Sequence, residues 1–364
     1  MTHTKNQIVN VLKILATCAV VINHLLYPVF SRADFFLGKG WWVATFFYSS
    51  SVIAVPLFVI INGYLLLPKK ETITRTYLRI LNRLVIPLIF WFAFFLFWRN
   101  HYYPDGHSLS QIIGILLSGG IYHYYFLVLL VGLQLLLPIW RLIIAYGKNY
   151  LIHLVGAGSF FVSLSTYLIL YSGLVNGAGF TLVSWWLPFT GYFWWGYWRQ
   201  KFVLAPTKYW LLSASSMFFL IIFLSHLGIK AATQNISLLR QNGIFYWHSL
   251  VSLPVFILSI SIFEATMNSQ LLKQILQNKS ILRLTNNLVK QTYGVYLCHF
   301  FVIEWIDIKY GFAIEFMQSD IRSFIITRTV LVFIISFGIS FILNKTPFLQ
   351  RVVGVTPGEK KHKS

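Results

Sequence analysis

Long apolar stretches, broken by short groups of charged residues, proline and glycine, recur from one end of the chain to the other. Most of them reach the roughly 20 residues that an α-helix needs to cross the hydrocarbon core of a bilayer. The apolar segment 110–121 is shorter, and we expect it to be interfacial or re-entrant. We place ten spans, at about 8–30, 43–67, 80–98, 124–144, 150–171, 181–198, 208–227, 244–264, 293–308 and 324–343. The pattern predicts an all-α, polytopic membrane protein.

The composition supports this prediction and excludes a soluble domain. Of the 364 residues, 57% are hydrophobic and only 10% are charged, which is too apolar for a water-facing surface. The first apolar run lacks a small-residue cleavage site, so we expect it to remain as a span. We predict a single transmembrane domain over 1–350 and a short basic cytoplasmic tail over 351–364.

The formal net charge of +20 indicates topology rather than nucleic-acid binding, because the basic residues are spread over many short loops. With the N-terminus inside, the cytoplasmic segments hold roughly twenty Lys and Arg residues and the outer segments hold about eight. This asymmetry places both termini in the cytoplasm.

Several kinds of chemistry find no support in the sequence. Cys18 and Cys298 lie inside apolar runs, so we interpret them as small core residues rather than a disulfide or a metal site. We find no phosphate-binding glycine loop, dinucleotide fingerprint, nucleophile elbow or paired-histidine spacing. The sequence therefore predicts no metal site and no serine hydrolase.

Ionisable groups inside spans are candidates for function, because their burial in lipid is costly. Lys13 and His24 are eleven residues apart, close to three helical turns, so they share one face about 16 Å apart along the axis. A neutral imidazole at His24 can take a proton from a hydroxyl that attacks a thioester. Two alternatives stay open: Lys13 can extend its amine to the inner surface, and His24 can be a hydrogen-bonded structural residue.

The ninth span carries a second histidine, His299, with Tyr296 one turn before it. His299 can orient a reacting group or complete a hydrogen-bond network, or it can be a structural helix contact. Glu304 lies inside the same span, and we expect it to pair with a cation such as Arg328.

Arg79 and Arg83 lie one helical turn apart before Pro87, at the inner start of the third span. Two guanidinium groups in this arrangement can hold the phosphates of a cytoplasmic nucleotide cofactor. The alternative is that they only anchor the span at the inner membrane surface.

Six segments, in order, resemble the acyltransferase-3 family of bacterial membrane O-acyltransferases, over nearly the whole chain. They are the Lys13 to His24 spacing and the segments 55–66, 122–138, 188–197, 293–299 and 345–354, and the spacing of Arg83 to Pro87 also fits. The chain departs from the family pattern in having Lys13 where Arg is usual, Asn10 where Asp is usual and Asn62 where Ser is commoner. Lys13 offers a point charge without a planar fork, and Asn10 removes an ion-pair partner.

The resemblance implies an acyl-CoA donor, most often acetyl-CoA, that is reached from the cytoplasm. It also implies an acceptor hydroxyl on a cell-surface or exopolysaccharide sugar, and a place in the bacterial plasma membrane. The N-terminal histidine is the family's usual proposed base. Some relatives are suspected of adding succinyl groups or of working in polysaccharide export, so the acyl group stays open.

We therefore expect an acyltransferase whose basic residues near the thioester also favour the developing oxyanion. Its site residues fall into three groups, which are catalytic His24 and His299, donor-binding Lys13, Arg79 and Arg83, and acceptor-binding His123, Tyr125, Tyr296 and Asn62. The expected partners are acyl-CoA, a surface glycan and the lipid bilayer, with no nucleic acid and with a homodimer left open.

A rival hypothesis is a non-catalytic transporter or flippase for a polysaccharide or its lipid-linked precursor. It needs a polar path and no base, and discontinuous helices in two related repeats would favour it. We see no such repeat in the sequence. A structural or sensor protein is a third hypothesis, but it explains neither His24 nor the basic inner loops as a set.

Overall fold

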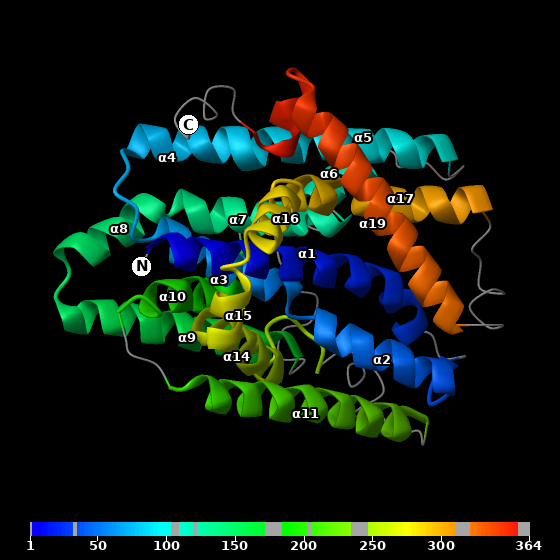
Figure 1. Cartoon of the computed structure of the whole chain (residues 1–364), viewed down its shortest axis with the longest axis horizontal. Coiled ribbons are helices and arrows are strands. Elements are labelled where there is room, and N and C mark those ends of the chain that lie inside the picture. Colours follow the sequence, from blue (N-terminus) through cyan, green and yellow to red (C-terminus); the bar gives the residue numbers. More distant parts are fainter. Residues whose placement is uncertain are drawn as a thin grey trace.

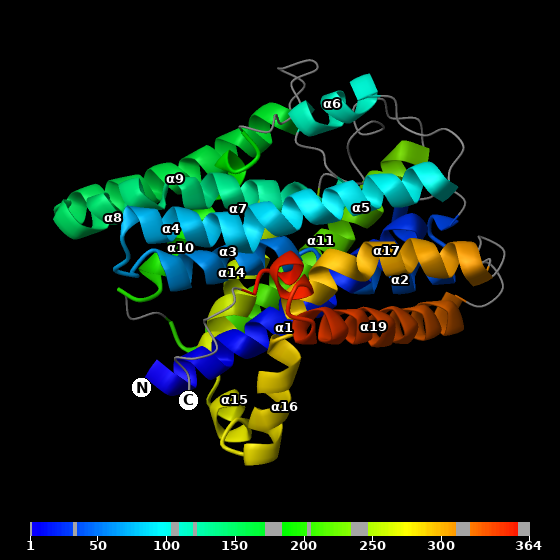
Figure 2. The ribbon, with the colours of Figure 1, turned by 90° about the horizontal axis from the view of Figure 1, so that it is seen from above.

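The computed structural model describes residues 2–31, 35–102, 109–118, 122–171, 184–201, 205–233, 247–310 and 321–355. Every regular element in these residues is a helix, which confirms the all-α prediction. Most helices run along one common direction, horizontal in Figure 1, whereas α15 and α16 lie across it (Figure 2).

The helices of the first half are α1 (Thr2–Ser31), α2 (Lys39–Ser51), α3 (Ala54–Leu66), α4 (Ile73–Ile80), the π-helix η2 (Leu81–Val85), α5 (Ile86–Tyr102), α6 (Leu109–Ser118), η3 (Tyr122–Tyr124), α7 (Tyr125–Leu135), α8 (Leu137–Tyr146) and α9 (Asn149–Tyr171). Those of the second half are η4 (Leu187–Phe189), α10 (Thr190–Trp198), α11 (Thr207–Thr233), α14 (Leu253–Asn268), α15 (Gln270–Ile275), α16 (Lys279–Val289), α17 (Thr292–Tyr310), α19 (Ile321–Lys345) and η5 (Leu349–Val353).

Within the described residues, five helices are long and apolar enough to cross a membrane. They are Lys5–Ser31, Lys39–Leu66, Ile73–Tyr102, Thr207–Lys230 and Ser323–Lys345, and the pair α7 and α8, bent by 40°, makes a sixth if it is one span. The protein is therefore a multi-pass membrane protein. Helices α9, α10, α14 and α17 lie in the remaining four predicted spans, and the count of ten stays a prediction.

Three of the predicted spans are irregular, and in each case a proline follows the irregularity. Proline has no N–H to donate to the carbonyl four residues before it, which weakens the helix there. The break between α2 and α3 comes just before Pro56, the π-helix η2 just before Pro87, and the bend between α7 and α8 just before Pro138. Proline position therefore explains where these spans depart from straight α-helices.

Helices α3 and α10 approach each other closely because each has a glycine at the contact. A Cβ at Gly63 would lie 1.8 Å from the Phe193 carbonyl oxygen, and a Cβ at Gly196 would lie 2.2 Å from that of Ile60. Small residues allow such backbone contact between membrane helices. Both glycines belong to segments that carry the family resemblance, so packing accounts for part of those motifs.

The chain after α19 turns back onto the bundle and packs against α5 (Figure 1). The Trp91 indole donates to the Val352 carbonyl at 2.9 Å. Gly354 has a left-handed φ of 68°, and a Cβ there would lie 2.7 Å from the Tyr293 ring. Residues 351–355 of the predicted tail are thus part of the packed structure, and 356–364 lie outside the described residues.

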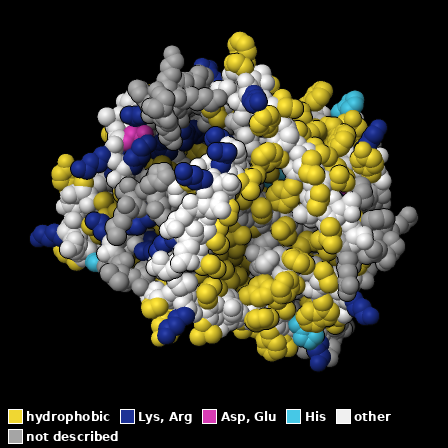
Figure 3. Space-filling view, viewed as in Figure 1, with side chains coloured by type: hydrophobic (Ala, Val, Ile, Leu, Met, Phe, Trp, Pro, Cys, Tyr) yellow, Lys and Arg dark blue, Asp and Glu magenta, His cyan; other side chains and the backbone are white. Residues whose placement is uncertain are grey.

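The surface divides into an apolar and a basic region. Figure 3 shows hydrophobic side chains over the middle and right of one face, and Lys and Arg gathered toward the left. Large side chains such as Phe161 and Ile334 are 72% and 64% exposed. Exposed apolar area on this scale is expected of a surface that lipid covers.

Candidate functional site

Three histidines from distant parts of the chain meet inside the bundle. His24 of α1 lies 5.2 Å from His299 of α17 and 6.1 Å from His123 of η3, measured between ring centroids. His123 and His299 are 5.3 Å apart. His123 and His299 are buried, whereas His24 is half-buried. The fold therefore brings together three of the residues that the sequence singled out, and we call them the histidine cluster.

Phenylalanine side chains hold the histidine cluster in place. Phe300 stands edge-on to His24 at 5.3 Å and stacks on His123 at 4.8 Å, and Phe95 stands edge-on to His123 at 5.7 Å. The His24 ring thus faces the interior of the protein rather than lipid.

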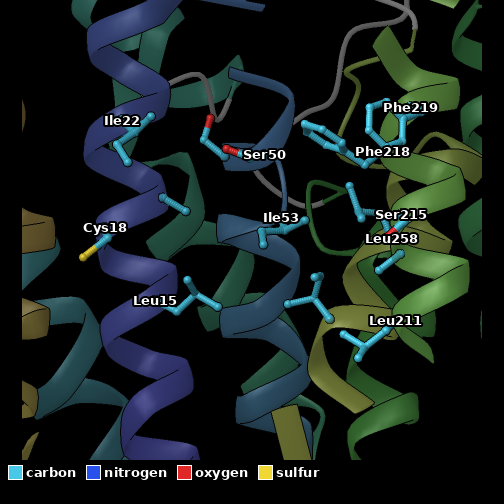
Figure 4. A pocket seen from close by; sticks show the side chains of 14 residues that line it. Leu15, Cys18, Ile22, Ser50, Ile53, Leu211, Ser215, Phe218, Phe219 and Leu258 are labelled. Atoms are coloured by element: carbon cyan, nitrogen blue, oxygen red, sulfur yellow. The ribbon is translucent and has the colours of Figure 1, made fainter. Parts of the chain in front are cut away.

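The opposite face of α1 lines a different space. An apolar cavity of about 430 Å³ lies between α1, α2, α11 and α14 (Figure 4). Its walls include Leu15 and Ile22 from α1, Ile53 just before α3, and Phe218 from α11. The residues that line this cavity include no histidine and no charged side chain. Neither Lys13 nor His24 lines this cavity.

One hydrogen bond determines the tautomer of His299. Its Nδ1 lies 2.6 Å from the Tyr296 carbonyl oxygen, and a carbonyl can only accept, so Nδ1 carries the proton. In the neutral ring, Nε2 then presents a lone pair. That atom is buried and has no hydrogen-bond partner within the described residues. His299 can therefore accept a proton or a hydrogen bond inside the cluster.

His123 is held through its backbone. The Tyr296 hydroxyl donates to the His123 carbonyl at 2.8 Å, while both ring nitrogens of His123 are buried without a partner among the described residues. Buried polar atoms without partners are costly, so they mark places where a ligand can supply the missing bonds. No group of three or more His, Cys, Asp or Glu residues in the described ranges has a metal-binding arrangement.

A basic pocket of about 360 Å³ lies next to the histidine cluster. Four cations line it, Lys13, Arg79, Arg83 and Lys290, and no carboxylate does among the described residues. Tyr296 also lines this pocket, and its ring centroid is 6.0 Å from that of His299. Tyr296 therefore stands between the basic pocket and the cluster.

The π-helix η2 and Pro87 shape one wall of the basic pocket. The Ile86 N–H donates to the Leu81 carbonyl five residues back, which places an extra residue in this turn. In a regular α-helix the Arg83 carbonyl would accept from residue 87, but Pro87 has no N–H. The Tyr293 hydroxyl donates to that carbonyl at 2.7 Å instead, and Tyr293 itself lines the pocket.

A buried carboxylate outside the pocket positions Arg79. Glu71, between α3 and α4, lies 3.4 Å from the Arg79 guanidinium, 3.4 Å from that of Arg141 and 3.1 Å from the Lys69 amine. Burial raises the pKa of the Glu71 carboxyl, but the Lys69 hydrogen bond and the Arg79 charge outweigh this and hold the pKa below its usual range. Glu71 is therefore a charged anchor for the pocket.

The other side of Arg79 is held by two amides. Arg79 donates to the Gln134 side-chain oxygen at 2.8 Å, and the Gln134 amide donates to the Asn62 side-chain oxygen at 3.1 Å. Gln134 and Asn62 both line the basic pocket. Asn62, which we expected to bind the acceptor, therefore lines the basic pocket and is not part of the histidine cluster.

Two ion pairs lie on the far side of the cluster from the basic pocket. Glu304, one turn beyond Phe300 in α17, lies 3.1 Å from the Arg99 guanidinium of α5. Arg328 of α19 pairs with Asp307. Glu304 therefore pairs with a cation, as expected, but the cation is Arg99 and not Arg328, because α5 presents Arg99 to Glu304 and Arg328 pairs with Asp307.

The predicted site residues thus fall into two adjoining groups. His24, His123 and His299 form the cluster, Lys13, Arg79, Arg83 and Asn62 line the basic pocket, and Tyr296 contacts both. Tyr125 is separate from the pocket lining and packs on Trp185 at 5.2 Å. Sequence reasoning missed Glu71 and Gln134. Gln134 could have been found as the lone polar residue in the apolar run 126–137.

The described residues thus form a multi-pass helical bundle that holds a histidine cluster beside a basic pocket. A family model described as an acyltransferase domain, that of the acyltransferase-3 family, matches residues 6–345, and the chain belongs to this family. The protein is thus a membrane acyltransferase. No curated protein and no solved structure matches the chain.

Proposed function

We propose that the protein, in the bacterial plasma membrane, transfers an acyl group, namely acetyl, from acyl-CoA to a hydroxyl of a cell-surface or exopolysaccharide sugar. One observation carries this proposal: a half-buried imidazole, His24, contacts two further histidines directly beside a pocket lined by four cations. In this arrangement His24 can act as a base while the four cations bind a polyanionic donor beside it.

The basic pocket suits the donor. Acyl-CoA carries several phosphates at one end and the thioester at the other, and guanidinium forks match phosphate oxygens. Lys13, Arg79, Arg83 and Lys290 supply positive charge without a carboxylate among the described lining residues. Lys13 is about three turns of α1 from His24, so a phosphate held near Lys13 leaves the thioester room to extend toward the cluster.

In the proposed reaction, His24 accepts the proton of the sugar hydroxyl as its oxygen attacks the thioester carbonyl. The tetrahedral intermediate collapses with cleavage of the carbon–sulfur bond, and the departing thiolate takes the proton from the imidazolium. His299 Nε2 accepts a hydrogen bond that orients the His24 ring. The His123 ring, whose nitrogens lack partners within the described residues, offers hydrogen bonds to the reacting groups.

The proposed direction of transfer follows the predicted topology. In that predicted topology, the Lys13 and Arg79 side faces the cytoplasm, where acyl-CoA is made. The acceptor then approaches the cluster from the other side, past Phe300 and the pair of Arg99 and Glu304. In this proposal the donor reaches the histidine cluster from the cytoplasmic side, and the glycan reaches it from the outer side.

The decisive test is His24→Ala in protein of normal abundance, with surface glycan acylation measured by mass analysis. We expect loss of acylation by about 10²-fold or more. Wild-type acylation in this variant would refute the assignment of the base.

Donor binding is tested separately, by titration of purified protein with CoA. Arg83→Gln should weaken binding by about tenfold, because it removes a charge-assisted contact to phosphate. The control is Lys208→Gln, which changes an exposed cation at the start of α11 that does not line the pocket. Equal affinity in both variants would argue against the donor site, and a failure to bind CoA at all would favour a transporter.

A further inference from the structure

Helices α15 and α16 form a hairpin that projects sideways from the bundle between α14 and α17 (Figure 2). Both helices have side-chain N-caps. Ser269 accepts from the Leu272 N–H at 3.1 Å, and Asn278 accepts from the Ser280 and Ile281 N–H groups at 2.9 and 3.3 Å. Such caps stabilise short helices by about 1 kcal/mol each. The hairpin thus consists of two regular, capped helices and is not an irregular loop.

Four large apolar side chains of this hairpin face outward, although Leu276 is buried in the core. Leu271 and Leu284 are 67% and 58% exposed, and Ile275 and Ile281 are also exposed. In α16, Ile281 and Leu284 are three residues apart and so share one face. A helix at a water-facing surface normally turns its apolar face to the protein. The outward position of these four side chains therefore requires an apolar cover.

The side of α16 that faces the protein is mixed, because Thr285 is buried and Leu282 and Leu288 are half-buried. Asn286 accepts a hydrogen bond from the Asn10 side chain of α1 at 3.4 Å. Val289, the last residue of α16, and Lys290 after it line the basic pocket. The hairpin is thus joined at its end to the wall of that pocket.

The charge of the hairpin has one sign. Residues 269–291 contain Lys273, Lys279, Arg283 and Lys290 and neither aspartate nor glutamate. In Figures 1 and 3, which share one view, α15 and α16 lie at the border between the hydrophobic region and the region where Lys and Arg gather. Basic residues interleaved with exposed leucine and isoleucine, on helices that lie across the spans, are typical of interfacial membrane helices.

We propose that the α15–α16 hairpin is an interfacial anchor that binds anionic lipid headgroups of the bilayer. Leu271, Ile275, Ile281 and Leu284 insert among the outer acyl-chain carbons, and Lys273, Lys279 and Arg283 meet the lipid phosphates. By fixing α16 at the membrane surface, the anchor fixes Val289 and Lys290 in the basic pocket. The inference does not depend on the reaction that the protein catalyses.

The position of the apolar face is tested by fluorescence on the full-length protein in nanodiscs. An environment-sensitive label is placed at Leu284→Cys or at the neighbouring Arg283→Cys, with Cys18 and Cys298 replaced by alanine. We expect lipids with brominated acyl chains to quench the label at 284, and aqueous iodide to quench the label at 283. Iodide quenching of both labels would overturn the proposal.

The role of charge is tested by hydrogen–deuterium exchange of α16 in phosphatidylcholine nanodiscs with and without phosphatidylglycerol. We expect the anionic lipid to slow exchange by on the order of tenfold, and the double variant Lys279→Gln, Arg283→Gln to lose this effect. The double variant Lys148→Gln, Lys208→Gln, which changes cations outside the hairpin, should keep it. An exchange rate that is the same with and without phosphatidylglycerol would overturn the proposal. Exchange that slows only when a nanodisc holds two protein copies would also overturn it, and would indicate that a second copy covers the hairpin.

Discussion

The Tyr293 hydroxyl donates a 2.7 Å hydrogen bond to the Arg83 backbone carbonyl, to which Pro87 cannot donate because it has no N–H. This bond joins α17, which carries His299, to the π-helix that carries Arg83. It is therefore a direct link between the histidine cluster and the basic pocket.

Removal of the Tyr293 hydrogen bond should weaken donor binding as well as lower the stability of the fold. In Tyr293→Phe, we expect a loss of about 1 kcal/mol in unfolding free energy and a several-fold rise in KM for the acyl donor, because the η2 turn loosens. The matched control is Tyr192→Phe, which removes a hydroxyl bond of 2.7 Å to the Leu250 carbonyl away from the pocket. It should cost similar stability and leave the donor KM unchanged; equal KM values in the two variants would contradict the link.

The substitution His299→Asn distinguishes the role of Nδ1 from the role of Nε2. The asparagine amide can still donate to the Tyr296 carbonyl, as Nδ1 does, but it places no acceptor where Nε2 lies. We expect thermal stability near that of the wild type and a fall in kcat of about a hundredfold, because His24 loses its orienting partner. Thermal unfolding and single-turnover kinetics measure the two effects, and an unchanged kcat would show that His299 is only structural.

The Glu71 cluster should make stability depend on acid. The pKa of Glu71 is lowered in the folded protein, so its contribution is fully present above its ordinary value near 4.5 and is lost as pH falls through the folded value. Glu71→Gln, which resembles the protonated state, should therefore be less stable than the wild type at neutral pH. The gap should narrow below about pH 4.5 in thermal unfolding of the detergent-solubilised protein; a gap that stays constant at all pH values would contradict this role.

The contact of α3 and α10 should tolerate no added methyl group. In Gly196→Ala, the new Cβ would lie 2.2 Å from the Ile60 carbonyl and 2.4 Å from the Tyr64 nitrogen, so the helices must separate at a cost of about 1–3 kcal/mol. Gly338→Ala in α19 is the control, because nothing lies within 4 Å of its added Cβ. It should be neutral or slightly stabilising, since alanine favours a helix. Similar melting temperatures for the two variants would refute the packing argument.

The helical membrane class and most span positions followed from the sequence, because a helix that crosses lipid must satisfy its own backbone and show long apolar runs. Local breaks also had visible causes in Pro56, Pro87 and Pro138, although the spans were predicted as continuous. Candidate chemistry was visible for the same reason: lysine, arginine and histidine are costly inside lipid and therefore stand out.

What could not be predicted was which polar residues meet. Glu71 lies in the short loop between α3 and α4, and nothing local shows that Arg79 and Arg141 both converge on it. Glu304 had several cations within reach along the sequence, and the packing of α5 against α17 selected Arg99. Hydrophobicity and helix length are local properties that sequence carries directly, whereas the partners of a buried charge depend on how helices far apart in the chain are packed together.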